Sequence, residues 1–307
     1  MKNKINIIIV AASVVFLFAY VFWVDGVDNI VNLLISVSKG WLFVAVLMII
    51  IYWLLEALIL HIITKHFYKA QKFSSTLHTS MVGQLFNCLT PFSSGGQPMQ
   101  AFDMKRYGIP IGTATCSLLI KFIVYQFSLT ILSAIVLIFK FNYFSSQISG
   151  FVYLVIIGFL VNFIVLAFLI SIGFFKGFTT KCTNGIIRAL AKIHVIKRKE
   201  FRLQQAEEEI GRLYEGFQQI KKNKSLFFIN FFLSAIQIII FSAIPYFIYL
   251  AFGLHTESFV TIVCAQIFVS LITAFIPLPG AIGGAEISFY MFFELFFQNS
   301  VNTAILL

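Results

Sequence analysis

The sequence TPFSSGG at residues 90–96 has a counterpart, PGAIGG, at residues 279–284. Both contain a proline, three further residues and a Gly-Gly pair, and Pro91 lies 188 residues before Pro279. Gly/Pro breaks at corresponding positions in two halves of a membrane protein are typical of transporters built from inverted repeats, where they mark the binding site. A pattern this short also recurs by chance, because Gly and Pro are common in membrane helices.

The composition of the 307-residue chain places it in a membrane. Hydrophobic residues make up 60% of the chain, charged residues only 11%, and the mean hydropathy is +0.95. A soluble domain is nearer about 45–50% apolar and about 25% charged. The 38 phenylalanines are also too many for a soluble surface. We therefore expect a single transmembrane domain that covers residues 1–307.

Apolar runs predict an all-α fold, a polytopic transmembrane helical bundle. The first run, Ile5–Val24, is long enough to span a bilayer, and Asp25-Gly26 follows it instead of a small-residue cleavage site. We therefore expect a transmembrane helix there and not a signal peptide. Ser75–Thr90 and Ala285–Phe297 are weaker candidates. The other clear candidates are Trp41–Ile63, Gly112–Phe139, Gly150–Phe175, Leu226–Phe252 and Phe259–Phe275.

Basic residues set the expected orientation, because cytoplasmic loops of membrane proteins are rich in Lys and Arg. Lys2 and Lys4 place the N-terminus in the cytoplasm, and the loop at 64–72 carries three lysines and no acid. The loop at 176–224 holds twelve Lys or Arg against five Glu, which gives +7 of the net charge of +10. Such a basic surface also suits nucleic acid, but beside a bilayer we expect anionic lipid headgroups and no nucleic-acid partner.

Three apolar segments lie between these two basic loops, and three crossings would put the second loop outside. Ser75–Thr90 is short and polar for a span, so we predict that it does not cross. It would form a re-entrant hairpin that enters from the cytoplasm, turns at Pro91–Gly96 and returns through Gln97–Arg106. The second Gly-Gly segment would then start from the outer side, as in an inverted repeat with two re-entrant hairpins. Irregular backbone at membrane depth also implies a cavity beside these turns.

The second basic loop contains a further expected helix. Leu203–Ile220 carries acidic residues early, and basic residues follow at 221–224, which is the order that suits a helix dipole. We expect an amphipathic helix that either lies along the membrane face or forms a solvated connector. The four cysteines have no spacing typical of a disulfide framework or a metal site. We therefore expect no metal and no cofactor, and we find no catalytic motif.

The residues around the first Gly-Gly pair, TPFSSGGQPMQ at 90–100 and KRYGI at 105–109, resemble the flippase-like integral membrane family. This family comprises the transmembrane region of lysylphosphatidylglycerol synthases and stand-alone bacterial and archaeal relatives. The second motif, PLPG at 277–280 through GGAE at 283–286, is similar to the family's late Pro-Gly-Gly…Glu stretch. The resemblance covers essentially the whole chain.

The resemblance implies a lipid-translocating domain of the bacterial cytoplasmic membrane. In the two-domain synthases this region moves aminoacylated phosphatidylglycerol to the outer leaflet, and a soluble domain makes that lipid. Here the longest polar stretch is about 50 residues, below the ~100–150 residues of a usual domain, so we expect no enzyme activity. Many relatives carry arginines where this chain has Gln100 and Lys121. Because Lys lacks the bidentate fork of Arg, the headgroup preference is left open.

Glu56, in the middle of the span Trp41–Ile63, is the first candidate for a headgroup site. An ionisable side chain costs ~2.5–3.5 kcal/mol at the centre of a membrane helix and as a rule faces the bundle interior. We expect Glu56 either to bind a headgroup cation or a proton, or to be the structural partner of a nearby lysine. Lys121 is expected either to hold a lipid phosphate or to snorkel toward the cytoplasmic interface.

The remaining candidates lie on the two Gly-Gly motifs. If the return limb is helical, backbone amides near Gly96 at its start are expected to face an anion. The first copy carries more polar side chains, so it is expected to make most of the headgroup contacts. The predicted lipid-binding residues are Glu56, Pro91, Gly95, Gly96, Gln97, Gln100, Asp103, Lys121, Gly283, Gly284 and Glu286.

Together these observations predict a transporter that moves a phospholipid or a polyprenyl-linked lipid between leaflets, with aminoacyl-phosphatidylglycerol among the candidates. Without an ATP-binding motif, movement runs downhill or couples to an ion gradient. One alternative is the membrane-embedded part of a phosphatidylglycerol lysyltransferase system, or another lipid-modifying enzyme without its soluble catalytic domain. A membrane scaffold with a closed, apolar centre is a second alternative. Assembly into a homo-oligomer is left open.

Overall fold

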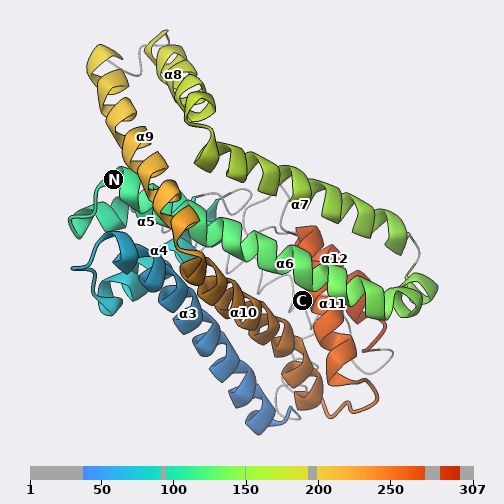
Figure 1. Cartoon of the computed structure of the whole chain (residues 1–307). Coiled ribbons are helices and arrows are strands. Elements are labelled where there is room, and N and C mark those ends of the chain that lie inside the picture. Colours follow the sequence, from blue (N-terminus) through green and yellow to red (C-terminus); the bar gives the residue numbers. More distant parts are fainter. Residues whose placement is uncertain (1–36, 91–94, 149, 193–198, 274–283, 298–307) are drawn as a thin grey trace.

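The structure is a computed structural model, and it describes residues 37–90, 95–148, 150–192, 199–273 and 284–297. Every regular element within these ranges is an α-helix, as the sequence predicts (Figure 1). The helices are α3 (Lys39–Phe67), α4 (Phe73–Leu89), α5 (Gly96–Arg106), α6 (Ile111–Gln147), α7 (Phe151–Phe174), α8 (Lys176–Lys192), α9 (Lys199–Lys222), α10 (Lys224–Ala251), α11 (Phe259–Thr273) and α12 (Gly284–Phe293).

Four of the described helices are long and apolar enough to cross a membrane, and α11 is a shorter apolar helix. The four segments are Lys39–Phe67, Ile111–Gln147, Phe151–Ser171 and Lys224–Ala251. They coincide with four of the predicted spans, so the prediction of a polytopic helical membrane protein is confirmed. The first predicted helix, Ile5–Val24, lies outside the described residues.

The two long helices α3 and α10 pack against each other in opposite directions. The backbone N–H of Ser38, just before α3, donates to the carbonyl oxygen of Ala251 at the end of α10 over 2.8 Å. Further along, the rings of Tyr52 and Phe241 lie with their centroids 5.2 Å apart. The start of α3 therefore lies beside the end of α10, and residues later in α3 meet residues earlier in α10.

The two basic segments lie at one end of the bundle. In Figure 1 the last turn of α3 and the first turns of α6 and α10 are at this end, from which α8 and α9 extend. Phe67 at the end of α3 lines a small cavity together with Thr113 on α6 and Arg212 on α9. We call this end of the molecule the basic end.

Helices α4 and α5 form a hairpin that leaves the basic end and returns to it. Thr79 contacts Asp103, and Asn87 contacts Gly96, so the two helices run antiparallel. Because α3 ends and α6 begins at the basic end, the segment between them makes no net crossing of the bundle. Its helices agree with the predicted limbs Ser75–Thr90 and Gln97–Arg106 to within two residues at either end. That this hairpin enters a membrane stays a prediction.

The described helices also fall into two similar sets. In the first, α3, α4 and α5 have 29, 17 and 11 residues, and in the second, α10, α11 and α12 have 28, 15 and 10. Since α3 and α10 are antiparallel, the second set is inverted relative to the first. The ring of Phe297, after α12, packs on Tyr249 and Phe252 near the end of α10, away from the basic end. This is the arrangement expected of an inverted repeat. The second Gly-Gly turn, within 274–283, lies outside the described residues.

The predicted helix Leu203–Ile220 lies within α9, which packs on α6. Glu209 accepts a hydrogen bond from the backbone N–H of Gly112 over 2.6 Å, in the first turn of α6, where a helix dipole favours negative charge. A Cβ on Gly216 would lie 2.5 Å from Sγ of Cys116, so the two helices are in close contact. α9 therefore packs on α6 along one face, and whether its other face meets a membrane or solvent stays a prediction.

Replacing Gly96 by alanine is expected to separate α4 from α5. A Cβ at this position would lie 2.6 Å from the carbonyl oxygen of Gly83, which belongs to the backbone of α4 and has little room to move. Overpacking of this kind costs typically about 1–3 kcal/mol, so Gly96→Ala should lower the midpoint of thermal unfolding in detergent. Gly185→Ala is the matched control, because a Cβ there meets no atom within 4 Å. Equal midpoints for the two variants would contradict the close crossing.

Candidate functional site

Glu56 joins three helices through its two carboxylate oxygens. On α3 it lies buried, and its Oε1 accepts a hydrogen bond from Nζ of Lys121 on α6 over 2.7 Å. Its Oε2 accepts from the side-chain amide of Gln84 on α4. Only 16% of the Lys121 side chain and 8% of the Glu56 side chain are exposed. Glu56 and Lys121 therefore form a buried ion pair between two membrane-spanning helices. We call Glu56, Lys121 and Gln84 the charged triad.

Two phenols lie beside the charged triad. Tyr52 precedes Glu56 by one turn of α3, and Tyr125 follows Lys121 by one turn of α6, which places each on the same face as its charged neighbour. Both tyrosines are close enough to Glu56 to interact with it electrostatically. The surroundings of the carboxylate thus include three kinds of polar group, namely an ammonium, an amide and two phenols.

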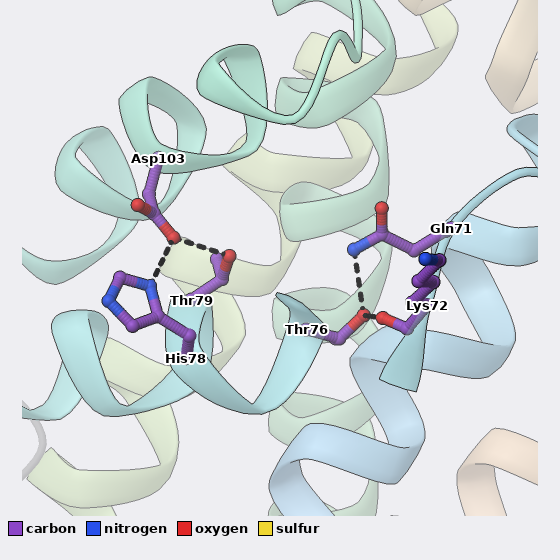
Figure 2. Close-up of polar contacts among 6 residues, drawn as sticks. All are labelled: Gln71, Lys72, Thr76, His78, Thr79 and Asp103. Atoms are coloured by element: carbon purple, nitrogen blue, oxygen red, sulfur yellow. Dashed lines mark hydrogen bonds and ion pairs between the residues drawn. The ribbon is translucent and has the colours of Figure 1, made fainter. Parts of the chain in front are cut away.

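A second polar cluster holds α4 against α5 (Figure 2). Oδ2 of Asp103 accepts from the hydroxyl of Thr79 over 2.7 Å and lies 3.0 Å from Nδ1 of His78. A carboxylate only accepts, so Nδ1 of His78 is the donor in this contact. The Asp103 side chain is 6% exposed, whereas His78 is 56% exposed and has its ring edge-on to Tyr107. Asp103 is thus a buried hydrogen-bond acceptor, and the imidazole that donates to it is exposed.

A third set of contacts closes the elbow between α3 and α4. The hydroxyl oxygen of Thr76 accepts from the side-chain amide of Gln71 over 2.8 Å and lies 3.3 Å from Nδ1 of His61 on α3. The same hydroxyl is 3.2 Å from the carbonyl oxygen of Lys72, to which it donates (Figure 2). These bonds fix the start of α4 and hence the direction in which the hairpin leaves α3.

Two of the amides at the start of α5, where we expect an anion, have acceptors within the hairpin. The N–H of Gly95 donates to the hydroxyl of Thr90 over 2.8 Å, and the N–H of Gly96 donates to Oδ1 of Asn87 over 3.1 Å. Both acceptors come from the last turn of α4 and its cap. They satisfy two of the free donors that a helix start presents, so these two amides are occupied within the hairpin.

The other predicted site residues have different positions. Gln100 is buried against Gly83, where a Cβ would collide with the Gln100 amide, and Gln97 is half-buried on the first turn of α5. Gly284 is the first residue of α12. Pro91, Gly283 and the side chain of Glu286 lie outside what the structure describes. None of the described contacts joins Asp103 or Gln100 to the charged triad. The predicted residues on α5 therefore contact α4 separately from Glu56 and Lys121.

The whole chain, from residue 7 to residue 307, matches the family described as the lysylphosphatidylglycerol synthase transmembrane region. The chain belongs to this family. No curated protein and no solved structure gives a significant match. The resemblance seen around the two Gly-Gly motifs is therefore confirmed.

In this family member the two repeat units are held together by different chemistry. The first unit uses the polar contacts described above. In the second, Phe268 of α11 and Phe292 of α12 stack with centroids 6.0 Å apart, and Phe144 of α6 lies 5.6 and 5.7 Å from their rings. Among the described residues, polar contacts thus join α4 to α5, whereas stacked phenylalanines join α11 to α12. No group of three or more His, Cys, Asp or Glu in the described part of the chain is placed to hold a metal ion.

Sequence reasoning missed the roles of several α4 side chains. Thr79, Gln84 and Asn87 were evidence only that the segment is too polar for a span. The spacing Thr79, Gly83, Asn87 repeats every four residues, which places all three on one face of a helix. This signal predicts a polar, closely packed face. It does not show that the face meets α5, because that depends on the hairpin register.

A second lysine of α6 was also missed. Lys140 donates to the hydroxyl of Thr261 on α11 over 3.0 Å and lies 5.3 Å from the centre of the Tyr143 ring. It follows Lys121 by 19 residues, or about 28 Å along a helix, which is close to the ~30 Å thickness of a hydrocarbon core. Helix α6 therefore carries one lysine in the bundle interior and another toward the end away from the basic end.

A double-mutant cycle should reveal strong coupling between Glu56 and Lys121. Removing one partner of a buried ion pair leaves an unpaired charge and costs about 3–5 kcal/mol, so Lys121→Met and Glu56→Gln should each destabilise the protein clearly. The double variant should be destabilised by much less than the sum of the two. Unfolding midpoints in one detergent measure all four proteins.

The exposed ion pair of Arg212 and Glu209 provides the control. Loss of such a surface contact is worth about 0–1 kcal/mol, so Arg212→Met should leave the midpoint nearly unchanged. If the Glu56 and Lys121 effects are simply additive, the two side chains do not act as a buried pair.

Proposed function

We propose that this protein is a transporter that moves a phospholipid, or another lipid with an anionic head, between the leaflets of the bacterial cytoplasmic membrane. The observation that carries the proposal is the buried ion pair of Glu56 and Lys121, next to a helical hairpin in a chain that belongs to a lipid-related membrane family. Intramembrane ionisable residues are costly and usually mark a substrate or ion pathway. The N-terminus and the basic end are proposed to face the cytoplasm.

The chemistry of the charged triad suits a phospholipid head. The ammonium of Lys121 is a point charge that binds phosphate, and the carboxylate of Glu56 binds an amine or holds a proton. Gln84 and the phenols of Tyr52 and Tyr125 supply further polar partners, while the acyl chains stay in the bilayer beside apolar helices. The lysine Lys140, toward the other end of α6, would receive the phosphate in the opposite leaflet.

The described conformation is closed to such a lipid, because so little of Glu56 and Lys121 is exposed. Entry requires that α4 move away from α3 and α6, since Gln84 of α4 bonds directly to Glu56. The α4–α5 hairpin is thus the proposed gate. Its hydrogen bonds can be exchanged for bonds to a polar head at a small net free energy of about 0.5–1.5 kcal/mol each.

The family description favours one second candidate. A chain that matches the transmembrane region of a lysylphosphatidylglycerol synthase would also serve as the membrane-embedded part of a lysyltransferase system. In that case it would hold the lipid product for another protein and would not move lipids when reconstituted alone. Lipid movement by the purified chain therefore separates the two candidates.

Reconstitution into vesicles with an acyl-chain-labelled fluorescent phosphatidylglycerol tests the proposal. Wild-type protein should expose inner-leaflet label to a membrane-impermeant quencher, and Glu56→Gln with Lys121→Ala should slow this by tenfold or more. The reason is that each lost charge-assisted hydrogen bond is worth about 1.5–3 kcal/mol, and ~1.4 kcal/mol is a factor of ten. Lys39→Ala, at an exposed lysine on the same helix as Glu56, is the matched control and should keep the wild-type rate. Wild-type and double-variant rates that do not differ would rule the site out.

A further inference from the structure

The ammonium of Lys121 is already paired with a carboxylate in the described conformation. It is 2.7 Å from Oε1 of Glu56, and the pair is almost fully buried. A lipid phosphate that binds Lys121 must therefore displace the carboxylate. Once displaced, Glu56 would be an unpaired charge among apolar helices, at the cost that breaking a buried pair carries.

Two kinds of cargo remove this unpaired charge. A zwitterionic head brings its own cation, which takes the place of Lys121 beside Glu56 while the phosphate takes the place of Glu56 beside Lys121. An anionic head such as that of phosphatidylglycerol brings no cation, so the carboxylate must be neutralised by a proton. The physical reason is that each charge in a site without water needs an opposite charge beside it. An isolated ionised group there is much less stable than its neutral form.

The groups around Glu56 leave it as the proton acceptor. Lys121 and Tyr125 face it from α6, Tyr52 from α3, and the neutral amide of Gln84 from α4. Helix α10, which packs on α3, carries no Asp, Glu, Lys, Arg or His from residue 225 to residue 251. Helix α4 carries His78, which is bonded to Asp103 of α5, and the exposed Cys88. Within the described surroundings of the triad, no second carboxylate competes for the proton.

We propose that an anionic phospholipid is carried together with one proton, which converts the Glu56 carboxylate to the neutral acid, whereas a zwitterionic phospholipid is carried without one. This inference rests on the proposed function. The step breaks no bond in the lipid. One proton passes from water on the entry side to Glu56 and leaves to water on the exit side. The neutral acid still accepts from Gln84 through its carbonyl oxygen, and its O–H donates to the bound head.

The stoichiometry fixes what drives transport. One lipid of charge −1 and one proton move together, so the step is electroneutral and responds to a pH difference but not to a membrane potential. At equilibrium the ratio of the lipid between leaflets follows the proton ratio, which is about tenfold per pH unit because one unit is a tenfold change in proton activity. The anionic lipid accumulates in the leaflet that faces the more alkaline solution.

Vesicles that hold wild-type protein and a pH difference of about one unit test this, since the expected ratio is about tenfold. Acyl-chain-labelled phosphatidylglycerol is compared with acyl-chain-labelled phosphatidylethanolamine, and the leaflet distribution is read with an impermeant quencher after equilibration. Phosphatidylglycerol should gather on the alkaline side, and phosphatidylethanolamine should stay evenly distributed. Collapsing the pH difference with a proton carrier should restore an even distribution of both.

Glu56→Gln sharpens the test, because the amide is neutral and cannot exchange a proton. In this variant phosphatidylglycerol should move as a lone charge, with a distribution that follows an imposed membrane potential and ignores pH. Rapid movement of phosphatidylglycerol by wild type with no skew toward the alkaline side overturns the proton exchange and leaves the transporter standing. If neither lipid moves, the transporter proposal itself fails, and this inference fails with it.

Discussion

A carboxylate among apolar helices needs a partner, and this constraint organises the first half of the molecule. Glu56 lies in the middle of α3 and has two partners, Lys121 of α6 and Gln84 of α4. The first contact joins two helices that are otherwise held by apolar packing, around residues such as Ile59 and Ile120. The second contact fixes α4, and α5 is placed by its own contacts with α4.

The hairpin is then built on a second constraint, the close approach of two backbones. Gly83 and Gly96 allow α4 and α5 to come so near that the Gln100 side chain fits against one glycine and the Asn87 side chain caps the other. Helices α4 and α5 thus meet through polar contacts, and α4 begins and α5 ends at the basic end. In the inverted unit, α11 and α12 meet through stacked phenylalanines instead.

The sequence identifies the ionisable residues of this site but not their contacts. Glu56 and Lys121 stand out because charges are rare in apolar runs, yet they are 65 residues apart and several other lysines were available as partners. The crossing count predicted the hairpin between α3 and α6, since it depends only on charge and length. The sequence does not show that the amides of Gly95 and Gly96 bond to Thr90 and Asn87, because this depends on where α4 ends. The lipid-binding role of the predicted site residues stays a prediction, and Pro91, Gly283 and the Glu286 side chain lie outside what the structure describes.

The different chemistry of the two repeat units suggests different tasks. Apolar residues of similar volume commonly replace a buried ion pair with no loss of stability, so stability alone does not require charges at positions 56 and 121. Separating the aromatic rings of α11 and α12 would lose packing that a lipid head does not restore. The hydrogen bonds that hold α4, by contrast, go to groups of the kind a lipid head carries. Under the proposed function, the first unit would therefore open toward a polar cargo and exchange one set of bonds for another, while the second would stay closed as the surface against which it moves.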